Sequence, residues 1–141
     1  MFPQLLLGIS GAIFLGYGVL CWIDPEIPAD YAGLFIATHN GYAEMAAMYG
    51  GLQSGFGLVL ILGALIPKYR HAALWLVLIC IGSLAAGRGS IAFSNLDSSF
   101  QVNNTSLGLA FSSGFTAYTW GSLAFEITLA LLAAVALIRH R

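Results

Sequence analysis

Long apolar runs separated by short polar segments dominate the chain. Four of these runs reach the length that crosses a lipid bilayer, about 20 residues each, and they cover approximately residues 4–22, 44–66, 72–93 and 116–138. The runs are continuous and do not alternate at every second residue, so they favour helices over the strands of a barrel. The pattern predicts an all-α integral membrane protein, a four-helix transmembrane bundle that forms one domain over residues 1–141. The first run lacks the basic start and cleavage site of a signal peptide, so we expect it to remain as a helix.

The segments between the predicted helices differ in length. Residues 67–71 form a tight turn, whereas the first and third loops are longer and contain the short apolar runs 31–38 and 107–111. Neither run is long enough to span a membrane. We expect them to form short strands over the mouth of the bundle, or interfacial segments at the level of the lipid headgroups.

Charged residues in the loops indicate the orientation. The flanking Lys and Arg residues lie in the second loop or at the C-terminus: Lys68, Arg70, Arg139 and Arg141. The first and third loops contain acidic residues but no Lys or Arg. Because short loops rich in Lys and Arg stay in the cytoplasm, both termini are predicted to be cytoplasmic, with loops one and three outside.

Composition narrows the possible functions. Hydrophobic residues make up 59% of the chain, charged residues only 8%, and the net charge is −1. No basic run is long enough to hold a nucleic-acid backbone, so a nucleic-acid partner is excluded. Cys21 and Cys80 are expected at different depths, and the absence of a C-x-x-C motif argues against a thiol oxidoreductase.

Three charged residues interrupt the apolar runs: Glu44, Arg88 and Glu126. A charge in the hydrocarbon layer costs roughly 2.5–3.5 kcal/mol on insertion scales, so such residues usually mark a functional site. Counting about 1.5 Å per residue places all three in the outer half of the bundle. An Arg88–Glu126 pair would satisfy both groups. It would form either a polar pocket that opens outward or an ion pair that sets the helix register.

Other polar residues extend this candidate cluster. Thr119 and Ser122 share a helical face with Glu126, whereas Tyr49 and Gln53 lie on a different face of the second helix from Glu44. The small residues Gly51 and Gly55, four apart in that helix, are expected to allow close helix packing. We therefore expect a ligand-binding or buried polar cluster that comprises Glu44, Tyr49, Gln53, Arg88, Thr119, Ser122 and Glu126.

A divalent metal ion is one possible ligand. His39 lies near the expected outer mouth, and together with Glu44 and Glu126 it would provide an imidazole and two carboxylates. No established metal-binding spacing joins the three residues. The alternative is a solvated loop histidine and no metal or other cofactor.

Four separated elements resemble a bacterial family of four-helix inner-membrane proteins that is known only as a domain of unknown function. These elements are Glu44, Tyr49–Gly51, Gly87–Arg88 and Glu126. Within that family the chain is most similar to the AciT-type proteins of the cell envelope. The resemblance implies an inner-membrane location, periplasmic loops one and three, and a supporting role in envelope integrity. Met45 and Ala46 stand where the family often has a basic residue, and the third loop is longer than usual.

Three function classes remain after these observations. The favoured class is a non-enzymatic envelope protein whose outward polar pocket binds a metal ion, a lipid headgroup or a partner protein, with a homo-oligomer as a further possibility. The second is a small proton-coupled transporter that uses Glu126, although the first helix has no membrane carboxylate. The third is a membrane enzyme acting on a lipid or a quinone, for which the sequence shows no catalytic motif.

Overall fold

A computed structural model describes residues 1–94 and 115–139, and every regular element in these ranges is a helix. The elements in chain order are α1 (Phe2–Ile23), α2 (Glu26–Ala32), α3 (His39–Met45), the π-helix η1 (Ala46–Leu52), α4 (Gln53–Leu65), α5 (Pro67–Leu76), the π-helix η2 (Val77–Ile81), α6 (Gly82–Ala92) and α7 (Ala117–Arg139). Elements α3, η1 and α4 form one continuous helix, as do α5, η2 and α6.

Four of the resulting helices are long and apolar enough to cross a membrane: Phe2–Ile23, His39–Leu65, Pro67–Ala92 and Ala117–Arg139. The predicted all-α membrane fold is confirmed, and the chain is a multi-pass membrane protein. Of the two alternatives for the first loop, the strand is wrong, because residues 31–32 end α2 and residues 34–37 have no regular structure, and the interfacial segment stays a prediction. The run at 107–111 lies outside the described residues.

Two helices begin earlier than predicted. The second begins at His39 and not at residue 44, because the Thr38 side-chain oxygen accepts a hydrogen bond from the Gly41 backbone N–H at 3.1 Å and caps the helix. The third begins at Pro67 and not at residue 72. Proline is well suited to the first helical position, since its fixed φ is helical and the N–H it lacks would have no helical partner there.

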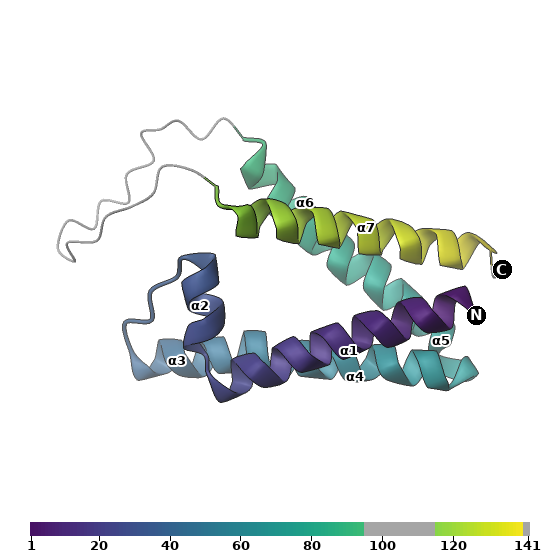
Figure 1. The fold of residues 1–141 in the computed structure, drawn as a ribbon, viewed down its shortest axis with the longest axis horizontal. Coiled ribbons are helices and arrows are strands. Elements are labelled where there is room, and N and C mark those ends of the chain that lie inside the picture. Colours follow the sequence, from purple (N-terminus) through teal and green to yellow (C-terminus); the bar gives the residue numbers. More distant parts are fainter. Residues whose placement is uncertain (95–114, 140–141) are drawn as a thin grey trace.

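The helices pack as two pairs (Figure 1). Helix α1 lies along α4, while α7 lies along the continuous helix α5–η2–α6. The start of α1 and the end of α7 lie at the same end of the bundle, which we call the terminal end. The two pairs diverge toward the opposite end, which we call the loop end, and there the short helix α2 approaches α7.

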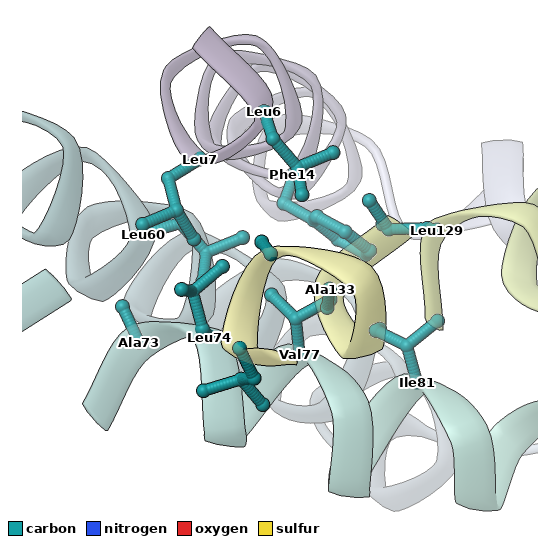
Figure 2. Close-up of a cluster of buried hydrophobic side chains, with 12 residues drawn as sticks. Leu6, Leu7, Phe14, Leu60, Ala73, Leu74, Val77, Ile81, Leu129 and Ala133 are labelled. Carbon is teal, nitrogen blue, oxygen red and sulfur yellow. The ribbon is translucent and has the colours of Figure 1, made fainter. Parts of the chain in front are cut away.

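The apolar core lies in the terminal half of the bundle (Figure 2). Leu7 from α1, Leu60 from α4 and Val77 from η2 are fully buried and meet Ala133 from α7. Above this core, the Phe14 ring packs edge-on against Phe56, with ring centroids 4.9 Å apart. The close packing of all four spans in this half leaves the divergent half as the place where a polar site can be built.

Glycines bring α1 and α4 into close contact, but they are not the glycines that the sequence indicated. A Cβ atom added to Gly57 would meet the α1 backbone at Leu15 and Gly11, and one added to Gly50 would lie 2.8 Å from the Trp22 Cα atom. A Cβ atom added to Gly55 would meet nothing within 4 Å. The expected packing of the Gly51 and Gly55 face is therefore wrong, since the neighbouring face of the same helix packs on α1.

Candidate functional site

Arg88 of α6 and Glu126 of α7 form an ion pair in the loop-end half of the bundle. The Arg88 Nε atom donates to Glu126 Oε2 at 3.1 Å, and Nη2 donates to Oε1 at 2.9 Å. Two parallel hydrogen bonds between a guanidinium and a carboxylate are the strong, orientation-specific form of this interaction. The expected pairing of Arg88 with Glu126 is present.

Burial differs between the two partners. The Glu126 side chain is 9% exposed and the Arg88 side chain 28% exposed. Arg88 lies four residues before the end of α6, about 6 Å along the helix, and Glu126 lies nine residues after the start of α7, about 14 Å along it. The long Arg88 side chain spans this difference in depth, so the carboxylate is enclosed while the guanidinium stays nearer the surface.

Tyrosines surround the ion pair. The Arg88 guanidinium lies 5.9 Å from the centre of the Tyr118 ring, at a distance that allows a cation–π interaction. Tyr17 of α1 and Tyr49 of η1 lie within electrostatic range of Tyr118, and Tyr49 also lies within that range of Arg88. Tyr31 of α2 stacks on Tyr118 with ring centroids 6.3 Å apart and an interplanar angle of 19°. Side chains from all four spans and from α2 therefore converge on one polar and aromatic cluster.

An open groove of about 460 Å³ lies between α6 and α7 beside the ion pair. We call it the α6–α7 groove, and it is lined by Ser83, Leu84, Gly87, Arg88 and Ile91 from α6, by Thr119 from α7, and by Phe115, which lies two residues before α7. Arg88 belongs both to the ion pair and to the wall of this groove. Its guanidinium is the charged group through which the buried pair reaches the surface of the bundle.

The other residues expected in the cluster occupy different environments. Thr119 lines the α6–α7 groove, and Ser122 is half-buried one helical turn before Glu126. Gln53 is half-buried on α4, and no hydrogen bond in the described part of the chain joins it to the ion pair. Glu44 is exposed on α3, away from Arg88 and Glu126. Because α3 begins at His39, Glu44 is also not in the first turn of its helix.

The structure does not bring together His39, Glu44 and Glu126, the residues considered as metal ligands. Within residues 1–94 and 115–139, no three His, Cys, Asp or Glu side chains come close enough to hold a metal ion. His39 is exposed and lines a separate hollow of about 420 Å³ in the first loop, whereas Glu126 is buried against Arg88. The Thr38 cap fixes His39 as the first residue of α3, and the ion pair occupies the Glu126 carboxylate.

Three tyrosines of the cluster were missed by the sequence reasoning. Tyr118 could have been found, because Tyr118, Ser122 and Glu126 follow one another at intervals of four and therefore share a helical face. Tyr17 has a weaker signal, since the other polar side chains of α1 at helical spacing from it are only Ser10 and Cys21, and neither is charged. Tyr31 has none, because its contact with Tyr118 depends on where α2 lies relative to α7.

A family model described as a domain of unknown function, DUF4345, matches residues 2–111. The match covers α1 to α6, including Arg88, and ends before α7 and Glu126. No curated protein and no solved structure is detectably similar to the chain.

Proposed function

We propose that this chain, which belongs to the DUF4345 family of unknown function, is a non-enzymatic binding protein that supports the integrity of the cell envelope. Its binding site is the Arg88–Glu126 pair together with the surrounding tyrosines and the α6–α7 groove. We place it in a bacterial inner membrane, like the AciT-type proteins that its motifs resemble, with the loop end facing the periplasm.

One observation carries the proposal, namely the ion pair inside the loop-end half of a membrane bundle. A purely structural pair is often no more stabilising than well-packed apolar side chains of similar volume. Arg88 also remains partly exposed and borders an open groove, which a pair serving only to hold two helices together does not require. Partly exposed charge beside a groove is typical of a ligand site.

The surroundings of the pair favour binding over catalysis. The cluster is made of Arg88, Glu126 and the tyrosines Tyr17, Tyr31, Tyr49 and Tyr118. Catalysis on a lipid or a quinone would use a nucleophile held next to a base, or a pair of thiols. Tyrosine hydroxyls and a guanidinium are hydrogen-bond donors suited to holding an acceptor-rich ligand in place.

Complementation of a bacterial strain that lacks its own copy of the gene tests the proposed function. We expect the wild-type chain to restore resistance to bile salts and exclusion of a hydrophobic dye. The double variant Arg88→Gln/Glu126→Gln should fail to restore either, because it keeps a polar side chain at both positions but removes both charges. Immunoblots of the membrane fraction check that both proteins reach the same level.

Lys68→Gln is the matched control for this experiment, since it removes an exposed positive charge at the terminal end of the bundle. It should complement as well as the wild type. Full complementation by the double variant at normal protein level would show that the pair has no role in envelope integrity, and the proposed function would be wrong.

A further inference from the structure

We infer that the α6–α7 groove holds one phospholipid, with the lipid phosphate on the Arg88 guanidinium and an acyl chain along the apolar wall of the groove. This inference rests on the proposed function and specifies the ligand class of the same site. Four observations carry it: the unused donors of Arg88, the charge distribution of the chain, the depth of Arg88, and the composition of the groove wall.

Arg88 has donors left after it has paired with Glu126. The carboxylate engages the Nε and Nη2 edge of the guanidinium. A guanidinium carries five N–H donors, and the two on Nη1 have no hydrogen-bond partner in the described residues. A phosphate accepting from these donors would lie on the opposite edge from the Glu126 carboxylate, so its attraction to the guanidinium outweighs its repulsion by the more distant acid.

Charge distribution also points to an anionic group at this position. Arg88 is the only Lys or Arg between Arg70 and Arg139 in the sequence. The other Lys and Arg residues that the structure describes, Lys68, Arg70 and Arg139, belong to the terminal end. An anionic lipid group at the loop end therefore has one basic side chain that can bind it, and that side chain lies in the groove.

The depth of Arg88 matches the position of a lipid headgroup. The span Pro67–Ala92 contains 26 residues and is therefore about 39 Å long, whereas the hydrocarbon core is about 30 Å thick. Each end of the span thus extends about 4–5 Å beyond the hydrocarbon on average. Arg88, about 6 Å from the loop end of α6, lies at the boundary between acyl chains and headgroups.

The groove wall suits an acyl chain below a phosphate. Leu84 lies one turn deeper than Arg88 on α6, while Ile91 and Phe115 form the rim nearer the loop end. A Cβ atom added to Gly87 would meet nothing within 4 Å, so the space over this glycine is open. A volume of about 460 Å³ is within the range of about 300–1,000 Å³ that small-molecule sites occupy.

Native mass spectrometry of the detergent-purified full chain, titrated with dipalmitoyl phosphatidylglycerol, tests the inference. We expect one lipid to bind the wild type. Dipalmitoylglycerol has the same chains without the phosphate. Its affinity should be lower than that of the phospholipid by a factor of about ten or more, as expected for loss of a charge-assisted hydrogen bond. Glycerol phosphate, which lacks the chains, should not displace the bound lipid. Equal binding of dipalmitoylglycerol, or displacement by glycerol phosphate, would overturn the lipid assignment.

Two glycine variants separate groove filling from general effects on the bundle. Gly87→Leu places an apolar side chain in the groove, at a position where a Cβ atom meets nothing within 4 Å, and should reduce lipid binding about tenfold or more, a loss of about 1.4 kcal/mol. Gly55→Leu is the matched control, because a Cβ atom there also meets nothing within 4 Å but the residue lies outside the groove. Unchanged binding to Gly87→Leu would overturn the inference, as would unchanged binding to the folded double variant Arg88→Gln/Glu126→Gln.

The binding and complementation experiments distinguish a failure of the lipid inference from a failure of the proposed function. If Gly87→Leu loses the lipid but still complements, the lipid site stands and its proposed role in envelope integrity is wrong. If the double variant Arg88→Gln/Glu126→Gln binds the lipid normally but fails to complement, the proposed function stands and the lipid inference is wrong.

Discussion

Arg88 and Glu126 depend on each other because each would be a poorly solvated charge if the other were absent. The carboxylate is the more enclosed of the two, and the strongest of its hydrogen bonds come from one edge of the guanidinium. Removing one partner of a buried pair typically costs about 3–5 kcal/mol, whereas replacing both by apolar residues is often neutral. The pair therefore contributes more to the orientation of Arg88 than to net stability.

Substitution of one partner should be more harmful than substitution of both. Arg88→Ala leaves the Glu126 carboxylate buried without a partner. We expect this variant to lower the free energy of unfolding by about 3 kcal/mol. This value is the lower end of the range for buried pairs, because Arg88 is partly exposed. The double variant Arg88→Met/Glu126→Leu should be within about 1 kcal/mol of the wild type. Unfolding of the detergent-solubilised variants by circular dichroism measures both, and equal losses would contradict this account of the pair.

The helices of the first pair are held together by the face that α4 presents to α1. Gly57 packs on Gly11 and Leu15, Ser54 packs on Gly18, and the backbones approach closely at each contact. Lipid removes the usual hydrophobic driving force between transmembrane helices, so close van der Waals packing of this kind determines which faces associate. The second pair is less closely packed near its loop end, where the α6–α7 groove opens.

Adding a methyl group should distinguish the packed face of α4 from the open one. Gly57→Ala places a Cβ atom against the α1 backbone, and overpacking of this kind typically costs about 1–3 kcal/mol. Gly55→Ala meets nothing within 4 Å and should be neutral or stabilising by up to about 1 kcal/mol, because alanine is the better helix former. Thermal unfolding in detergent measures the difference, and equal melting temperatures for the two variants would show that this helix face is not a close contact.

The molecule as a whole is polarised along its long direction. The apolar core and the basic residues Lys68, Arg70 and Arg139 lie at the terminal end, whereas the ion pair, Tyr31, Tyr118 and α2 lie toward the loop end. An even number of spans places both chain ends on the same side, as Figure 1 shows. The positive-inside rule then predicts that the terminal end faces the cytoplasm.

Labelling of single cysteines in intact cells tests this orientation. In a Cys21→Ala/Cys80→Ala background, a membrane-impermeant maleimide should label Asp30→Cys in the first loop and should not label Lys68→Cys in the second loop. Both positions are exposed in the structure, so a difference in labelling reports the side of the membrane. Permeabilised cells provide the control in which both are labelled. Labelling of Lys68→Cys alone in intact cells would reverse the predicted orientation.

Much of the fold could be predicted because transmembrane helices satisfy their own backbone hydrogen bonds. The hydrophobic pattern alone therefore locates the spans, to within five residues at each end. The larger boundary errors, at His39 and Pro67, arose where a threonine cap and a proline start the helix within a polar segment. In the candidate site, the depth of each residue along its helix was enough to predict the Arg88–Glu126 pair, because the sequence places no other Lys or Arg at that depth.

Everything that depends on how one helix faces another required the tertiary structure. Gly51 and Gly55 have the same helical spacing as the packed face that contains Gly50 and Ser54, so periodicity cannot say which face meets α1. The sequence by itself determined the helical membrane class, the number of spans and the unusual charges within them, because these follow from local hydrogen bonding and the cost of burying charge. Tertiary structure alone decided that Tyr31 stacks on Tyr118 and that Glu44 lies apart from the pair, because both depend on contacts between segments that are distant in sequence.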